Sequence, residues 1–251
     1  MKDIHQNKMS KPFYFEGSRE HGVLLRHGFT ATPGTVLPVG QALSEAGFTV
    51  NGILLPGHGY TVSDMQQCRW YDWLFAAQAA FDALSKRCEK VSVVGLSMGG
   101  ALTLALCESR SVYRAVPIAA ALKTINRKNW AAPLVWRRIP MLYGGAPEKQ
   151  EDFLEEYNLA YNGTPLRNVA DLNKLMHIVK RNLQKITCPL LVVQAGLDKT
   201  VHPDSAKWIL TKTSSPHREY LFLKDSPHVC TVGKEREVLN RHIIDFLNKD
   251  L

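Results

Sequence analysis

The sequence lacks the cysteine patterns that mark small stabilised frameworks. Its five cysteines are odd in number and none is paired in a C-x-x-C motif; they are Cys68, Cys88, Cys107, Cys188 and Cys230. This arrangement indicates neither a disulfide framework nor a zinc site, so we expect no metal. Reduced thiols in a cytoplasmic protein are the simplest interpretation.

Long apolar runs are also missing. The first twenty residues are polar and charged, without the apolar segment that export signals contain. No uninterrupted apolar run in the sequence is long enough to cross a bilayer. We therefore expect no export signal and no membrane span.

Acidic residues are absent from one long stretch. Between Ser109 and Pro147 there are seven Lys or Arg residues and no Asp or Glu, in a chain with a formal net charge of +8. One interpretation is a solvated basic face. The other is that five cations attract acidic substrates or an anionic surface. These five are Lys123, Arg127, Lys128, Arg137 and Arg138. No recognised nucleic-acid-binding motif accompanies the charge, so we expect no nucleic acid partner.

Length and hydrophobic content fit a globular α/β protein. With 251 residues, 45% of them hydrophobic, the chain can fill the core of one large α/β domain or two small ones. Strand candidates lie at 12–16, 22–26, 48–55, 91–95, 112–120, 189–195 and 219–223. Helix candidates alternate with them, among them an amphipathic segment at 70–86 and another at 234–247.

This alternation breaks in the middle of the chain. Between residues 122 and 183 strand character is lost, and short amphipathic runs, prolines and aromatic residues take its place. Such an insertion between β and α units predicts a helical cap. We expect residues 121–185 to form this cap, and residues 1–120 together with 186–251 to form the α/β core.

The stretch 91–100 predicts a sharp turn between a strand and a helix. It reads V-S-V-V-G-L-S-M-G-G, and a long apolar segment with helical character follows. The G-x-S-x-G pattern in this context describes a nucleophile elbow, in which a strained turn lifts a serine hydroxyl above the sheet. Ser97 is therefore the candidate nucleophile. A Gly/Ser turn before a helix can also be an N-cap or a phosphate-binding turn.

A second loop predicts donors for an oxyanion. The strand candidate 22–26 runs into His27, Gly28 and Phe29, which is where hydrolases with a nucleophile elbow place half of their oxyanion hole. The backbone N–H groups of Phe29 and Met98 are the candidate donors. We expect His27 to tie this loop through hydrogen bonds rather than to do chemistry. For His58, in the turn P-G-H-G-Y, anchoring the loop and lining the site entrance are both open.

An acid and a base complete the candidate set. Asp198 follows the strand candidate 189–195, and His228 follows the strand candidate 219–223. The carboxyl ends of parallel strands share one edge of a sheet, and the chain order Ser97, Asp198, His228 is that of the elbow-containing hydrolases. Asp204 is expected to cap or begin a helix instead. The other histidines weighed as base are His202, His217 and His242.

Together these motifs resemble the sequence blocks of α/β hydrolases. The blocks are L-L-R-H-G-F-T, L-L-P-G-H-G, V-V-G-L-S-M-G-G, L-L-V-V-Q-A-G-L-D with V-H-P-D-S-A, and S-P-H-V. The likeness spans nearly the whole chain, is weakest in the cap, and is nearest to small bacterial carboxylesterases related to monoacylglycerol lipases. It implies an α/β-hydrolase fold, a doubly wound and mostly parallel sheet with a small helical cap, and no cofactor. Arg26 departs from the pattern, because the strand before H-G is usually apolar.

The resemblance implies a serine esterase acting on a small-molecule ester. Ser97 would be the nucleophile, Asp198 the acid and His228 the base, with Phe29 and Met98 as oxyanion donors. We expect hydrolysis of short- to medium-chain carboxylic esters through an acyl-enzyme. The fold also hosts monoacylglycerol lipases, feruloyl-type esterases, thioesterases and amidases, whereas dehalogenation would require Asp at position 97. A ligand-binding relative with little turnover is the alternative outside enzymes, and a homodimer is possible.

Overall fold

The structure is a computed structural model that describes residues 7–143, 152–161 and 163–250. Two parts of the sequence discussed above lie outside the described residues. They are residues 1–6 of the polar amino-terminal stretch and residues 144–147 at the end of the stretch without acidic residues. The strands are β1 (Phe13–Phe15), β2 (Ser18–Arg26), β3 (Phe48–Ile53), β4 (Lys90–Leu96), β5 (Ala115–Ile118), β6 (Met141–Leu142), β7 (Thr164–Pro165), β8 (Leu190–Ala195) and β9 (Arg218–Leu223). The α-helices are α1 (Leu37–Glu45), α2 (Val62–Gln67), α3 (Trp70–Ser85), α4 (Met98–Cys107), α5 (Ala132–Val135), α6 (Leu166–Asn182), α7 (Asp204–Lys212) and α8 (Arg236–Asn248). Short 3-10 helices are η2 (Lys8–Ser10), η3 (Pro33–Val36), η4 (Arg127–Ala131), η5 (Leu183–Lys185) and η6 (Cys230–Val232).

One sheet organises the chain. Within the described residues, seven strands pair in the order β1-β3-β2-β4-β5-β8-β9. Only the β1–β3 pairing among them is antiparallel, and the other neighbours are parallel. Strands buried on both faces read as continuous apolar runs, as in β4 and β8, where nearly every residue is buried. The predicted mostly parallel sheet is confirmed.

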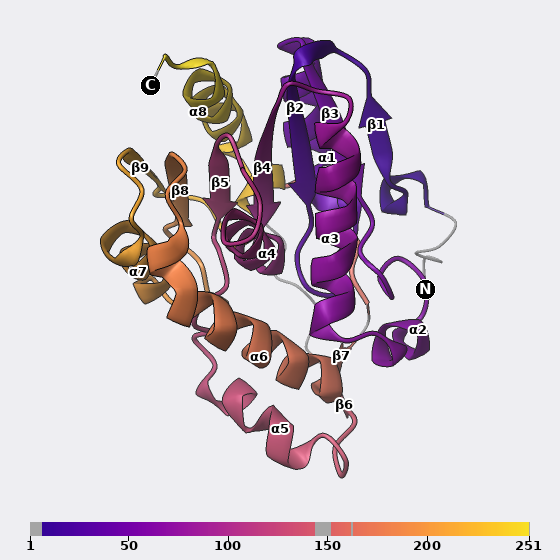
Figure 1. Cartoon of the computed structure of the whole chain (residues 1–251). Helices are drawn as coiled ribbons and strands as arrows, with labels where there is room; N and C mark the ends of the chain where they lie inside the picture. Colours follow the sequence, from indigo (N-terminus) through magenta and orange to yellow (C-terminus); the bar gives the residue numbers. More distant parts are fainter. Residues whose placement is uncertain (1–6, 144–151, 162, 251) are drawn as a thin grey trace.

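Helices cover both faces of the sheet (Figure 1). Successive strand side chains point to opposite faces, so Val93 joins an apolar cluster with α3, α4, α6 and α7, whereas Val94 joins a second cluster with α1 and α8. In the second cluster Leu43 of α1 and Phe246 of α8 are almost completely buried. The sheet is therefore doubly wound, as expected.

The segment predicted as a cap contains η4, α5, β6, β7 and α6. In Figure 1, α5 lies at the far side of α6 from the sheet. The helix α6 contributes the fully buried Leu175 and Val179 to the same apolar cluster as α3 and α4. It therefore serves as a layer on which the outer part of the segment rests, and the boundary of the cap at residues 121–185 stays a prediction.

A short helix stands where the sequence predicts a polar connection. Helix α2 begins after Thr61, whose Oγ1 accepts a hydrogen bond from Asp64 N while the Asp64 carboxylate accepts one from Thr61 N. This capping box stabilises the first turn. The helix has six residues, and Met65 is its one buried residue. A helical period in the apolar residues therefore cannot be seen in its sequence.

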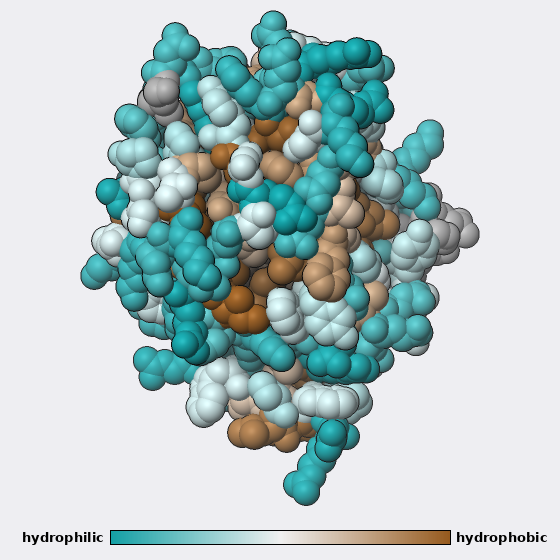
Figure 2. Space-filling view, viewed as in Figure 1, coloured by the Kyte–Doolittle hydropathy of each residue, from teal (hydrophilic) through white to brown (hydrophobic). Residues whose placement is uncertain are grey.

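The outer surface near α5 carries exposed apolar side chains. Trp130 is 69% exposed, Leu134 79% and Tyr143 75%. Figure 2 shows a brown patch at the lower end of the molecule, where Figure 1 places α5. Across the described ranges, no helix has both the length and the apolar character needed to span a bilayer.

Replacing Gly95 with Ala tests the close packing at the end of β4. A Cβ at this residue would lie 2.2 Å from the Gly99 carbonyl oxygen, which is backbone and cannot move without displacing α4. We expect Gly95→Ala to lower the free energy of unfolding by about 3 kcal/mol or more and Tm by about 10 °C, measured by circular dichroism. Gly233→Ala is the control, because the nearest atom to its Cβ would be 3.4 Å away. Equal Tm values for the two variants would contradict this packing argument.

Candidate active site

Ser97 occupies a strained turn between β4 and α4. Its backbone has φ 59° and ψ −114°, in a region that non-glycine residues rarely adopt. The turn is held on both sides, since Ser97 N donates to Ile118 O at 2.9 Å and Ser97 O accepts from Ala121 N at 3.0 Å. Such strain persists only where the surrounding structure enforces it. The predicted strand, turn and helix are all present here.

Arg26 lies beneath this turn, completely buried. Its Nη2 donates to Thr103 Oγ1 at 2.7 Å, and Thr103 Oγ1 in turn donates to Gly99 O at 2.9 Å. Burial lowers the pKa of Arg26 to about 9. Arg26, which stands where an apolar residue is usual, therefore connects β2 to the first turns of α4 through hydrogen bonds.

Asp198 and His228 form a hydrogen-bonded pair. The distance from His228 Nδ1 to Asp198 Oδ2 is 2.7 Å. The other carboxylate oxygen, Oδ1, accepts from Thr200 N at 2.7 Å and Val201 N at 2.8 Å. The Asp198 side chain is 1% exposed and that of His228 is 17% exposed, so the acid is enclosed and the imidazole reaches the surface. A carboxylate on Nδ1 leaves Nε2 as the nitrogen that can accept a proton.

The two loops that carry this pair are tied to each other. Gly196 N donates to Leu223 O at 2.7 Å, and Leu197 N donates to Ser226 O at 2.9 Å. Glu235, at the start of α8, stabilises the loop that carries His228. Its Oε2 accepts hydrogen bonds from Ser226 Oγ at 2.6 Å and from Asp225 N at 2.9 Å. Sequence reasoning missed Glu235, since a carboxylate before a helix is expected to act on that helix.

The Gly28–Phe29 turn lies beside Ser97. A Cβ at Gly28 would be 3.3 Å from Ser97 Cβ and 3.8 Å from Ser97 Oγ, so the backbone of this turn approaches the serine closely. Met98 is the first residue of α4, and the first N–H groups of a helix have no partner within it. The Gly28 backbone thus lies against the Ser97 side chain, and Met98 follows Ser97 directly at the start of α4.

All the candidate residues lie at one edge of the sheet. Leu96 pairs with Ile118 and Ile118 with Val193, so β4 and β5 end level with each other, whereas β8 and β9 end together at Ala195 and Leu223, two residues further along. Ser97, Asp198 and His228 follow these ends directly or within a short loop. The structure therefore places the three residues at the same edge of the sheet and joins Asp198 to His228 by a hydrogen bond, whereas their catalytic roles stay a prediction.

His27 and His58 are structural. His27 Nε2 accepts from Leu55 N at 3.1 Å and its Nδ1 donates to Gly28 O at 2.9 Å, which fixes the loop that carries Phe29. His58 Nδ1 donates to Pro56 O at 3.1 Å, and the two rings lie 4.9 Å apart. Both are fully buried, so His58 does not line an entrance. Burial lowers the pKa of His58 to about 4 and that of His27 well below its ordinary value.

The competing candidates are used elsewhere. Asp204 begins α7, as expected, and its carboxylate lies 2.6 Å from Lys123 Nζ. His202 Nδ1 accepts from Asp204 N at 3.1 Å, and His242 Nδ1 donates to Val238 O within α8. Lys123 therefore belongs to an ion pair, which weakens its part in the proposed attraction of anions.

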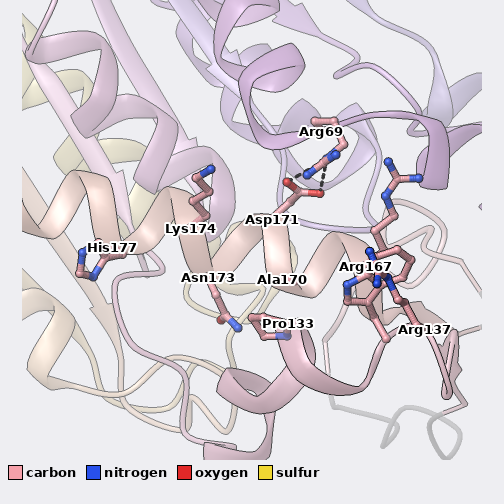
Figure 3. A pocket seen from close by; sticks show the side chains of 10 residues that line it. Arg69, Pro133, Arg137, Arg167, Ala170, Asp171, Asn173, Lys174 and His177 are labelled. Atoms are coloured by element: carbon pink, nitrogen blue, oxygen red, sulfur yellow. Dashed lines mark hydrogen bonds and ion pairs between the residues drawn. The ribbon is translucent and has the colours of Figure 1, made fainter.

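A basic pocket of about 740 Å³ lies between α5, α6 and the start of α3 (Figure 3). Arg69 faces Asp171 of α6, with Nε 3.1 and 2.9 Å from the two carboxylate oxygens. Two cations contact the Trp136 ring, with the guanidinium carbons of Arg137 and Arg167 5.4 and 5.7 Å from its centre. Sequence reasoning selected Arg137 but missed Arg69 and Arg167, which lie outside the acid-free stretch.

A doubly wound parallel sheet with a strained serine turn at its carboxyl edge is the architecture of the α/β hydrolases. A family model described as "Serine aminopeptidase, S33" matches residues 17–232. The chain belongs to this S33 family of α/β hydrolases. The predicted fold, the family resemblance and the expectation of a hydrolytic enzyme are confirmed.

Known relatives match over almost the whole length. The chain is 34% identical over 243 residues to a thermostable monoacylglycerol lipase from Bacillus sp. (strain H-257), covering 96% of this chain and 95% of the relative. It is 28% identical over 242 residues to a carboxylesterase from Bacillus subtilis (strain 168), covering 95% and 96%. A solved structure reported for LipS and LipT, two metagenome-derived lipolytic enzymes, matches with a TM-score of 0.90 and 31% identity, covering 97% of this chain and 99% of that chain.

The buried neutral His58 predicts a loss of stability in mild acid. In the unfolded chain this histidine takes up a proton near its ordinary pKa of about 6.5. In the folded chain its pKa is about 4, so it stays neutral down to that pH. Stability therefore falls as pH drops from 7 to 5, by about 2 kcal/mol for His58 alone. In urea unfolding, His58→Gln should lose about 2 kcal/mol less than the wild type over this range. The exposed His242→Gln serves as control and should lose as much as the wild type; an equal loss in His58→Gln would contradict the prediction.

Proposed function

We propose that the protein hydrolyses carboxylic esters through an acyl-enzyme on Ser97. The observation that carries this proposal is the 2.7 Å His228–Asp198 contact at the sheet edge where the strained Ser97 turn also lies. A serine hydroxyl is a weak nucleophile near neutral pH and needs an adjacent base oriented by an acid. The names of the relatives, a monoacylglycerol lipase and a carboxylesterase, support esters as the substrate class.

In the first half of the proposed reaction, His228 Nε2 takes the Ser97 proton as Oγ attacks the ester carbonyl carbon. The negative charge that forms on the carbonyl oxygen is stabilised by the N–H groups of Phe29 and Met98. One such donor typically contributes about 3 kcal/mol to the transition state. Asp198 stabilises the imidazolium without taking its proton. The imidazolium then protonates the leaving alcohol, and the acyl group stays on Ser97.

In the second half, water takes the place of the alcohol. His228 removes a proton from the water as its oxygen attacks the acyl carbon, and the same two amides hold the oxyanion again. Return of the proton to Ser97 Oγ releases the carboxylic acid. Each step uses side chains and backbone of this chain alone, so the mechanism calls for no cofactor.

The wall around Phe29 supports an apolar acyl group. The Phe29 ring packs edge-on against Trp73, with the ring centres 5.9 Å apart, and also against the apolar cluster of Ala132, Leu166 and Val169. Ester substrates with short to medium acyl chains would contact this wall next to Ser97. The small-molecule substrate class follows from this reasoning, whereas the cytoplasmic location and a homodimer stay predictions.

Monoacylglycerol hydrolysis is the second candidate. It is favoured by the 34% identity to a monoacylglycerol lipase over 96% of the chain. The exposed Trp130, Leu134 and Tyr143 near α5 also offer apolar surface at a substrate aggregate. A lipase should act faster once its substrate forms an interface, and an esterase should not.

Substitution of the triad tests the mechanism. We expect Ser97→Ala and Asp198→Asn each to lower kcat on 4-nitrophenyl butyrate by about 10⁴-fold, while circular dichroism and Tm stay close to those of the wild type. Asp204→Asn is the matched control, because this carboxylate contacts Lys123 and not His228, and it should retain kcat within about twofold. A fluorophosphonate should label the wild type but not Ser97→Ala. Turnover retained by Ser97→Ala would falsify the assignment.

The same assay separates the candidate functions. Turnover of 4-nitrophenyl esters of graded acyl length, with an optimum at short to medium chains, supports the esterase. A rate on monoacylglycerols that rises above the solubility limit supports the lipase. Labelling of Ser97 without turnover of either substrate contradicts both and indicates an activated serine with another substrate class, whereas no labelling favours a ligand-binding relative.

Salt dependence tests whether the basic pocket attracts anionic esters. Arg69, Arg137, Arg167 and Lys174 line it, and Asp171 is the acid among its lining residues. We expect kcat/KM for the mono-4-nitrophenyl ester of adipate to fall about threefold when NaCl rises from 0.05 to 0.5 M, because salt screens the attraction. Neutral 4-nitrophenyl hexanoate, with the same number of acyl carbons, is the control. Arg137→Gln should reduce the salt effect on the adipate ester, and equal responses of both esters would contradict the attraction.

A further inference from the structure

Two thiols meet at the edge of the sheet opposite Ser97. Cys107 is the last residue of α4, and Cys188 lies in the short connection that leads into β8. Their Sγ atoms are 3.5 Å apart, although the two residues are separated by 81 positions in the sequence. Because α4 starts directly after Ser97 and rises about 1.5 Å per residue, the thiols lie about 15 Å from the serine turn. All five cysteines fall in the described ranges, and this is the pair whose sulfurs are in contact.

The local geometry favours a bond between them. A disulfide has an S–S distance of about 2.0 Å, so the sulfurs must approach by about 1.5 Å. Cys107 stands at the end of a helix and Cys188 in a connecting segment, where the backbone can adjust more easily than inside an element. Cys107 Sγ also donates to Thr103 O at 3.2 Å, which keeps this thiol on the side of α4 that faces Cys188.

The pair is reachable from solvent. Both thiols are half-buried and line a hollow of about 730 Å³ together with Lys86, Lys90 and Arg110. Glu89 and Asp82 also line the hollow, but Asp82 is paired with Arg110 at 2.6 Å. The contact with Cys107 lowers the pKa of Cys188, whereas burial raises that of Cys107. Cys188 is therefore the thiol that ionises first.

We propose that Cys107 and Cys188 are a redox modification site and form a reversible disulfide that ties the end of α4 to the beginning of β8. The oxidant is a low-molecular-weight disulfide, RSSR. The Cys188 thiolate attacks one sulfur of RSSR, forms a mixed disulfide and releases RS⁻, which takes up a proton. Cys107 loses its proton to water and attacks Cys188 Sγ, which expels the second RS⁻. In sum, two protein thiols and RSSR become one protein disulfide and two RSH.

The bond would join the two halves of the core. The helix α4 begins at the Ser97 turn, and β8 leads to the Asp198 loop. The two cysteines are 81 positions apart, and the residues between them include the whole segment predicted as the cap. Closing a long loop restricts the unfolded chain and so favours the folded state. We expect oxidation to raise Tm by about 5 to 10 °C while kcat at 25 °C changes little.

Peptide mapping and thermal unfolding test the proposal on the full chain. The protein is incubated with oxidised glutathione, its free thiols are blocked with N-ethylmaleimide, and it is digested with trypsin. The expected product is peptide 91–110 joined to peptide 186–199, together with the rise in Tm, and dithiothreitol should reverse both. Glutathione retained on Cys188 without the joined peptide, or no change in Tm once the joined peptide has formed, would overturn it.

Variants and a second probe keep the test independent of folding defects. Cys188→Ala and Cys107→Ala should abolish the rise in Tm, whereas Cys68→Ser should keep it, because the Cys68 thiol contacts Asp64 O instead of another thiol. Phenylarsine oxide bridges neighbouring thiols and needs no variant. It should add one equivalent to the reduced wild type and protect both peptides from N-ethylmaleimide. Failure to protect either peptide would overturn the proposal, whatever the outcome of the ester assays.

Discussion

The close approach of β4 and α4 is the constraint on which the proposed site depends. Gly95 carries no Cβ, so β4 and α4 can pack with their backbones almost in contact, and Gly99 in the same way lets α4 approach the backbone of Arg26 and His27. The chain must then reverse within the single residue Ser97, which adopts φ 59°. This turn places the serine side chain beyond the end of β4, and the first N–H groups of α4 have no partner within the helix. The proposed nucleophile and one oxyanion donor thus result from the same packing contact.

Much of this arrangement could be predicted from sequence because it is local. The elbow, the H-G-F loop and the residues after β8 and β9 each depend on neighbours along the chain, and the sheet's shared edge brings them together. Polar contacts between distant segments gave no such signal. Arg26 contacts Thr103, 77 positions away in the sequence, and Arg69 contacts Asp171, 102 positions away. No sequence pattern around either arginine indicates which residue it binds. Helix α2 escaped prediction because six residues are too few to show a period.

The acid-free stretch shows why charge in a sequence does not specify its use. Arg110 is paired with Asp82 and Lys123 with Asp204. Arg114 is buried and donates to Phe246 O, which fixes the end of α8. Three of the cations therefore hold the fold together. Of the other four, Arg137, beside Trp136, borders a pocket.

The division of the proposed site between two distant parts of the chain has a consequence during synthesis. The serine turn belongs to the first half of the sequence, whereas Asp198 and His228 follow β8 and β9, which must pair beside β5 after the cap segment has been made. Such long-range pairings form late and slowly. A nascent chain that has not yet emerged past residue 228 holds the proposed nucleophile without its proposed base. Under the proposed mechanism it is therefore inert toward ester substrates until its synthesis is nearly finished.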